Sequence, residues 1–156
     1  MNWDALGALG EVLGAIAVVV SLLYLAAQVR TQNRESRLAA THEILEAYRN
    51  TGVAFQSAEN AQLLTKANHD FESLDEPQRI QIISLLIPVF RVWEEAFYQN
   101  RDGRFEDDMW DTMSKVFADV LSTRAFQQVW ELRQSGFSDL FRAHVDTLEV
   151  GEWKIE

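Results

Sequence analysis

The hydrophobic pattern divides the chain into an apolar N-terminal segment and a longer region with helical periodicity. Glu11 is the one charged residue between Leu6 and Val29. As a helix this segment is about 36 Å long at 1.5 Å per residue, against a hydrocarbon core of about 30 Å. We therefore predict a transmembrane anchor over residues 1–30. The alternative is a buried helix of a soluble domain, because Glu11 and three glycines lower the hydropathy.

Basic residues follow the apolar segment and none precedes it. Arg30, Arg34 and Arg37 lie directly after the span. Because basic residues favour the cytoplasmic side, we expect the N-terminus outside and the C-terminal region in the cytoplasm. A cleavable signal peptide is not expected, since its basic N-terminal region is missing.

One face of the predicted span carries small or polar side chains at spacings of three and four residues. Small residues allow close helix packing, and Gly10 and Gly14 form a G-x-x-x-G pair. The pattern predicts a homo-oligomeric seam, with chance occurrence of common residues as the alternative. We call these positions the small-residue stripe: Gly7, Gly10, Gly14, Ala17, Ser21, Tyr24 and Gln28.

Glu11 flanks the small-residue stripe and is the candidate functional group of the span. Ionisable groups inside membranes are functional candidates. One interpretation is a boundary carboxylate that reaches water or hydrogen-bonds to a partner helix. The other is a ring of carboxylates that attracts cations or passes protons.

The remainder of the chain predicts an all-α fold, in which the anchor continues into a cytoplasmic bundle of about four to six helices. The anchor helix is expected to end near 50–52. A core helix begins at Pro77 after Asp75 or Glu76 as N-cap, with a kink near Pro88. The other expected elements are helices near 60–67, 105–121, 123–134 and 138–149, a turn at 101–103, a domain over 31–150 and a tail at 151–156.

Apolar residues at helical spacing predict the domain core, which is a more common use of such a pattern than a cofactor box. The predicted core residues of the C-terminal half are Met109, Trp110, Met113, Val116, Phe117, Val120, Leu121, Phe126, Val129, Trp130 and Leu132.

Composition narrows the classes of function. The chain has no cysteine and a formal net charge of −10. Disulfides, thiolate zinc sites and cysteine nucleophiles are therefore excluded, and an acidic body is a poor partner for nucleic acid. The expected partners are the lipid bilayer, further copies of the chain, and a cytoplasmic or membrane protein.

No motif predicts catalysis or a cofactor. His42, Glu43, Glu46, Glu94 and Glu95 are the best metal candidates, but the Glu-x-x-His pairs of helical di-metal sites are missing. A candidate polar pocket consists of Glu94, Glu95, Tyr98 and Arg101, with simple pairing around a helix end as the alternative. We predict no metal, no cofactor and no enzymatic activity.

Several of these positions carry a resemblance. They are Gly10, Glu11, Tyr24, Leu25, Ala26, Gln28, Arg30, Trp93, Glu94, Phe97, Tyr98 and Gly103. At these positions the chain resembles a widespread family of uncharacterised bacterial single-pass inner-membrane proteins, and the resemblance implies an inner-membrane location but no activity.

We therefore expect a non-enzymatic, membrane-anchored protein that self-associates through the small-residue stripe and acts as a scaffold or regulatory partner. The alternative is a homo-oligomeric ion or proton channel with a ring of Glu11 carboxylates.

Overall fold

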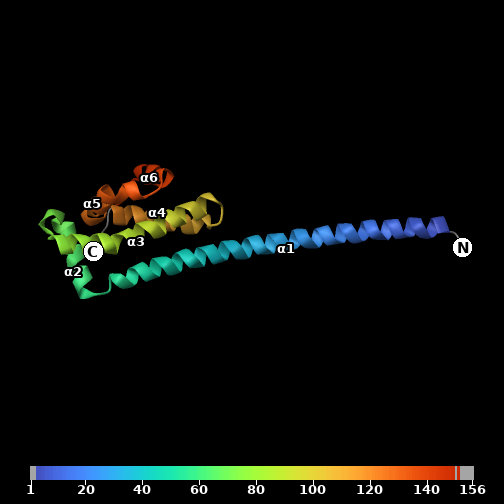
Figure 1. Cartoon of the computed structure of the whole chain (residues 1–156), viewed down its shortest axis with the longest axis horizontal. Coiled ribbons are helices and arrows are strands. Elements are labelled where there is room, and N and C mark those ends of the chain that lie inside the picture. The colour runs from blue at the N-terminus through green and yellow to red at the C-terminus, as the bar shows by residue number, and fades with distance from the viewer. Residues whose placement is uncertain (1–2, 150, 152–156) are drawn as a thin grey trace. The chain divides into compact units, whose positions relative to one another are not determined.

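Every element that the structure describes is helical (Figure 1). The structure is a computed structural model that describes residues 3–149 and 151, with side chains from residue 7 onward. This confirms the all-α prediction with one long apolar N-terminal helix. Apart from Gly151, the predicted tail lies outside the described residues. The α-helices are α1 (Trp3–Ala54), α2 (Ala58–His69), α3 (Glu76–Arg101), α4 (Asp107–Leu121), α5 (Arg124–Arg133) and α6 (Asp139–Asp146), with 3-10 turns at Phe71–Ser73 and Gln134–Gly136.

The chain forms two compact units, with the boundary after Leu38. The first unit contains the apolar part of α1. The second contains the last part of α1, from Ala39, together with α2 to α6. We call the second unit the helical domain.

The start of α3 follows from a capping box. Asp75 is the N-cap: its carboxylate accepts from the Gln78 N–H at 2.9 Å, and the Gln78 side chain accepts from the Asp75 N–H at 3.3 Å. Two of the four unpaired N–H groups of the helix start are thereby satisfied. Pro77 stands at the second helical position rather than the predicted first, and α3 continues through Pro88.

Gly103 ends α3 as the sequence predicts. Its φ of +68° is the left-handed conformation that glycine adopts without steric penalty. The Arg104 N–H donates to the Gln99 carbonyl at 2.8 Å and the Gly103 N–H donates to the Asn100 carbonyl at 2.9 Å. These two bonds form a Schellman motif, which reverses the chain toward α4.

The predicted end of α1 near Gly52 is wrong, because the helix continues to Ala54. A single glycine weakens a helix by about 1 kcal/mol without stopping it. The helix ends two residues later in a tight turn, where the Phe55 and Gln56 N–H groups donate to the carbonyls of Gly52 and Val53 at 3.1 Å.

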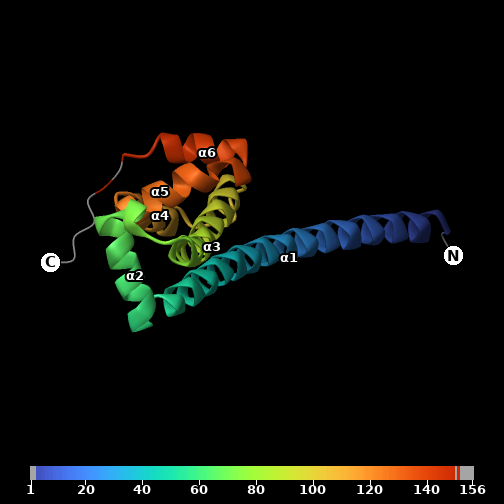
Figure 2. The same cartoon turned by 60° about the vertical axis from the view of Figure 1, so that its left-hand side comes forward.

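The core of the helical domain is built from aromatic rings around α3, which contacts α2, α4 and α5 (Figure 2). Trp93 stacks on Phe117 of α4 with ring centroids 4.7 Å apart and meets Phe141 of α6 edge-on at 5.3 Å. Phe90, one turn earlier, contacts the ring of Trp130 at 5.2 Å. Trp93, Phe90 and Phe141 are almost fully buried.

Most of the predicted core residues are buried or half-buried, but Leu132 is 53% exposed. It lies in the last turn of α5. Helical spacing indicates the face on which a residue lies, but not whether another element covers that turn.

Candidate functional site

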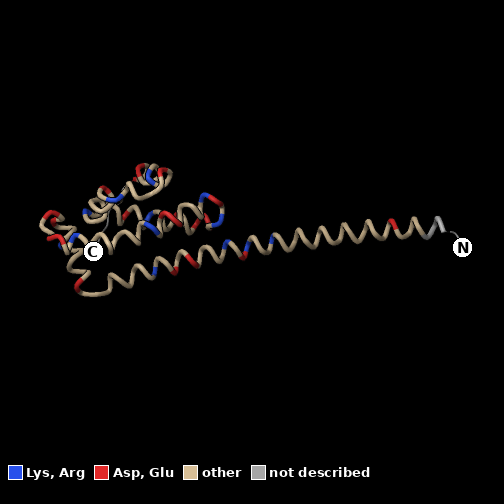
Figure 3. Tube along the Cα trace, viewed as in Figure 1, with Lys and Arg blue, Asp and Glu red and all other residues tan. Residues whose placement is uncertain are grey.

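The apolar segment of α1 is exposed along its whole described length. No residue is buried in the window that makes α1 long and apolar enough to cross a membrane. Leu9, Leu13 and Leu23 are more than 60% exposed. No charged residue occurs between Glu11 and Arg30, which Figure 3 shows as a long uncolored stretch of the trace.

The small-residue stripe leaves open space beside its glycines. A Cβ placed on Gly7, Gly10 or Gly14 meets no atom within 4 Å. The Ser21 hydroxyl donates to the Ala17 carbonyl of its own helix at 2.8 Å. Every position of the stripe, and Glu11 beside it, is exposed. The space beside these glycines is sufficient for the close approach of another helix.

The predicted basic residues follow the apolar segment on the same helix. Arg30, Arg34 and Arg37 are all exposed, at spacings of four and three that place them on one side of α1. They form no ion pair within the described chain.

The predicted polar pocket is divided by the structure. Glu94 and Tyr98 point to the start of α6: the Ser138 N–H donates to the Glu94 carboxylate at 2.9 Å, and the Tyr98 hydroxyl donates to the Ser138 hydroxyl at 2.7 Å. Arg101 lies over the Tyr98 ring at 4.9 Å. Glu95 is exposed and does not join them. The cluster holds the N-terminus of α6 against α3.

The carboxylate of Glu94 is held in its charged form. Burial alone raises its pKa, but hydrogen bonds from the Ser138 N–H, the Arg91 guanidinium at 2.7 Å and the Ser138 hydroxyl, with the positive charge of Arg91, lower the pKa below 4.5. Arg91 also donates to the Gly136 carbonyl at 2.9 Å. Glu94, Tyr98 and Arg91 each have a hydrogen-bond partner within the helical domain. The cluster therefore has a structural role.

The metal candidates do not assemble. Among the described residues, no group of three or more His, Asp or Glu side chains is placed to hold a metal ion. His42, Glu43 and Glu46 are exposed on α1.

His144 lies among aromatic rings. Phe97 stacks on its imidazole at 4.8 Å, and Trp110 and Trp93 lie at 5.6 and 6.3 Å. Its buried Nε2 has no hydrogen-bond partner within the described chain. Burial disfavours the protonated form and lowers the pKa of His144 below 6.5.

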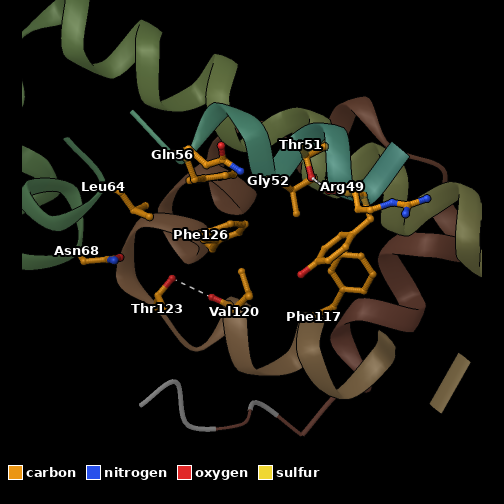
Figure 4. Close-up of a pocket in the computed structure, with 13 residues that line it drawn as sticks. Arg49, Thr51, Gly52, Gln56, Leu64, Asn68, Phe117, Val120, Thr123 and Phe126 are labelled. Atoms are coloured by element: carbon orange, nitrogen blue, oxygen red, sulfur yellow. Dashed lines mark hydrogen bonds between the residues drawn. The ribbon is translucent and has the colours of Figure 1, made fainter. Parts of the chain in front are cut away.

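The helical domain contains a cavity of about 500 Å³ that the sequence analysis did not find (Figure 4). This volume is within the usual range of about 300–1,000 Å³ for small-molecule sites. The end of α1 and the turn after it, with α2, α3, α4 and α5, supply its walls. The apolar lining consists mainly of Phe55, Leu64, Val89, Phe117, Val120 and Phe126.

Three of the six polar side chains of the cavity wall are hydrogen-bonded to the backbone. The Thr51 hydroxyl donates to the Tyr48 carbonyl at 2.7 Å, and the Thr123 hydroxyl donates to the Val120 carbonyl at 2.8 Å. The Asn68 side-chain oxygen accepts from the Ala125 N–H at 2.9 Å. The Tyr48 hydroxyl and the Gln56 side-chain amide also line the cavity, in walls that are otherwise mainly apolar.

Arg49 is the one charged residue among the thirteen that line the cavity. It lies at the edge, with its guanidinium directed away from the apolar walls (Figure 4). Arg49 is exposed and has no ion pair within the described chain. The cavity thus combines an apolar interior with a positive charge in water at its edge.

Comparison of the chain with protein-family models, curated proteins and solved structures gives no match.

Proposed function

We propose that this chain is a non-enzymatic, membrane-anchored protein whose anchor helix self-associates and whose helical domain acts as a scaffold or regulatory partner. The observation that carries the proposal is an apolar helical segment with eleven exposed aliphatic side chains, in a chain whose helical domain has its own buried core. The eleven residues are Leu9, Val12, Leu13, Ile16, Val18, Val19, Val20, Leu22, Leu23, Leu25 and Val29.

The free energy gained by burying the aliphatic side chains, compared with the cost of inserting one charge, favours a bilayer around this segment. Removing one such side chain from water gains about 1.5–3 kcal/mol. A charged side chain at the centre of a membrane helix costs about 3 kcal/mol on insertion scales, and less near the boundary. Glu11 lies near the N-terminal end of the segment, so its cost is far smaller than the combined gain of the aliphatic side chains.

The small-residue stripe supports self-association within the membrane. Helix pairs in lipid are stabilised by close packing, which glycine and alanine permit, and by hydrogen bonds between polar side chains. Ser21 already uses its hydroxyl within α1. Close approach at Gly7, Gly10 and Gly14 therefore supplies the main contact, and Gln28 supplies the free polar side chain.

Native mass spectrometry of the full-length protein in nanodiscs tests self-association. We expect a discrete oligomer that Gly14→Ile reduces to monomer, because the larger side chain prevents close approach. Val20→Ile adds a methylene group to a side chain outside the stripe and serves as the matched control. A monomeric wild type, or equal mass distributions for the two variants, would contradict self-association through this face.

The expected inner-membrane orientation can be measured directly, because the chain has no cysteine. Single cysteines at Asn2 and at the exposed Ser135 are probed with a membrane-impermeant maleimide on intact spheroplasts. The proposal expects labelling at position 2 before lysis and at position 135 only after it. The reverse pattern would overturn the orientation.

Ion flux separates the scaffold from the channel alternative. Liposomes containing the wild-type oligomer should be no more permeable to protons or monovalent cations than protein-free liposomes. A flux that Glu11→Gln abolishes, with the oligomer intact, would replace the scaffold by a channel.

A further inference from the structure

We infer that the cavity of the helical domain binds a fatty acid, with its acyl chain inside the cavity and its carboxylate in water beside Arg49. This inference does not depend on self-association or on the orientation of the anchor. It assigns a ligand class to the cavity shown in Figure 4.

The apolar walls of the cavity favour a ligand whose larger part is hydrocarbon. Leu64 of α2, Phe117 and Val120 of α4 and Phe126 of α5 line the cavity from different sides (Figure 4). Phe126 is 7% exposed, and Phe117 meets the Tyr48 ring edge-on at 6.0 Å, so this part of the lining is firmly packed. Since packed protein interiors contain few voids larger than a water molecule, an apolar group gains contacts by filling this one.

The hydrogen bonds already made by three of the lining side chains disfavour a strongly polar ligand. The hydroxyls of Thr51 and Thr123 and the side-chain oxygen of Asn68 all have backbone partners. A sugar or nucleotide buried here would lose many bonds to water and could replace only a few of them, through groups such as the Tyr48 hydroxyl and the Gln56 amide. A hydrocarbon chain requires no such bonds.

The positive charge of Arg49 favours a ligand with an anionic head group. The protein has a net charge of −10, yet the only charged residue that lines the cavity is Arg49, which no carboxylate of the described chain neutralises. An acyl chain that enters the cavity leaves its head at the edge, where the guanidinium is. A carboxylate there gains a charge-assisted contact. Because this contact is exposed to water, it contributes less than the burial of the chain.

Gly52 provides a variant that blocks the cavity without disturbing the fold. Gly52 lies within α1 and lines the cavity, and a Cβ there meets no atom within 4 Å. Leucine is a far better helix former than glycine. Gly52→Leu therefore preserves the helix while it removes space for about two methylene groups.

Photolabelling of the full-length protein in zwitterionic nanodiscs tests the inference. The probe is a diazirine derivative of dodecanoic acid at pH above 8, and the comparison probe is the corresponding alcohol. We expect the acid to label peptides of α4 and α5 that contain Phe117, Val120 and Phe126, and unlabelled dodecanoate to compete. The alcohol should label them about two- to fivefold less, because an exposed ion pair contributes that much.

The variants distinguish the cavity from unspecific contact with lipid. Gly52→Leu should lower labelling of α4 and α5 about tenfold, and Arg49→Gln should lower it about two- to fivefold. Arg133→Gln, at an exposed arginine outside the cavity, should leave it unchanged. Circular dichroism verifies that each variant is folded.

Two results would overturn the inference. One is labelling confined to the apolar segment of α1, which would show only partition of the probe into lipid. The other is labelling of α4 and α5 that Gly52→Leu does not reduce or that the alcohol matches. Either result leaves the mass and flux measurements of the proposed function unaffected.

Discussion

The apolar segment of α1 and the core of the helical domain are both hydrophobic, but their side chains differ in shape and surroundings. Between Gly7 and Val29 the only aromatic residue is Tyr24, and the other apolar residues are aliphatic and exposed. In the domain, Phe90 and Phe141 each pack against Trp93, and all three rings are buried.

The two regions suit two different ways of removing apolar surface from water. Aromatic rings from separate helices fill a core by edge-to-face and offset contacts, which require fixed partners. Aliphatic side chains exposed around a single helix suit a uniform apolar medium. Hydrophobicity alone does not separate the two regions, whereas ring content and burial do.

The largest expected effect is the loss of a core ring. Phe90→Ala should destabilise the helical domain by about 3–5 kcal/mol, since Phe90 contacts four other rings. Leu13→Ala, at a residue 64% exposed in the apolar segment, should change the same free energy by less than about 0.5 kcal/mol. Urea unfolding of the full-length protein, followed by tryptophan fluorescence, measures both. Equal losses of unfolding free energy in the two variants would contradict the proposed difference between the two regions.

The two regions also differ in where polar groups bond. In the apolar segment Ser21 bonds to its own helix, whereas Glu94 bonds to Ser138, which lies 44 residues away. Glu94→Gln should destabilise the domain by about 1–2 kcal/mol, because it removes a charged acceptor from a helix start. Glu95→Gln, at the exposed neighbouring residue, is the matched control and should be neutral.

The pH dependence of the unfolding free energy tests whether the charge of Glu94 is responsible for this effect. The pKa of Glu94 in the folded protein is lower than 4.5, so its contribution is complete above that pH and is lost as the pH falls through the folded-state pKa. The difference in unfolding free energy between wild type and Glu94→Gln should therefore shrink below pH 4.5. A difference that stays constant into strong acid would contradict the role of the charge.

Local signals in the sequence predict much of the fold and little of the candidate site. The N-cap Asp75 and the turn at Gly103 depend on residues within one helical turn, so they can be recognised without tertiary contacts. Two predictions were wrong: the end of α1 near Gly52 and the burial of Leu132. Both depend on whether a helix continues past a given residue or whether another element covers its last turn.

The cavity could not be predicted in this way. Its lining comes from five helices and the turn after α1, and residues as far apart as Arg49 and Phe126 meet there. Periodicity marks Phe117 and Phe126 as core residues, but the same pattern results whether a neighbouring space is filled or empty. The pairing of Glu94 with Ser138 escaped prediction for the same reason. The only signal at Ser138 was its preference for helix starts.

Glycines have opposite roles within the domain, and alanine substitution separates them. Gly103→Ala should destabilise the domain by about 1–2 kcal/mol, because its φ of +68° is unfavourable for any residue with a Cβ. Gly52→Ala should stabilise it by about 0.5–1 kcal/mol, because Gly52 is helical and its Cβ position is open. Thermal unfolding measures both changes. If both variants shifted the melting temperature in the same direction, the backbone conformation assigned to one of the two glycines would be wrong.

The smallest expected effect concerns the ionisable group that lies among apolar side chains in the domain. Glu11 in the apolar segment is exposed, whereas His144 is packed against Phe97 and Trp110. Burial lowers the pKa of His144 below 6.5, so the unfolded chain binds the proton more readily. Stability should therefore be complete above pH 6.5 and decrease as the pH falls toward the folded-state pKa.

The variant His144→Phe removes the titrating group and keeps a ring among the aromatic side chains. Between pH 7.5 and 5.5 its melting temperature should fall less than that of the wild type, and His42→Gln, at an exposed histidine, should behave like the wild type. This window lies above that of Glu94, so the two groups can be separated in one titration. If all three proteins lost stability in parallel, the neutral imidazole would contribute nothing to the packed core, and its ring alone would account for the contacts with Phe97 and Trp110.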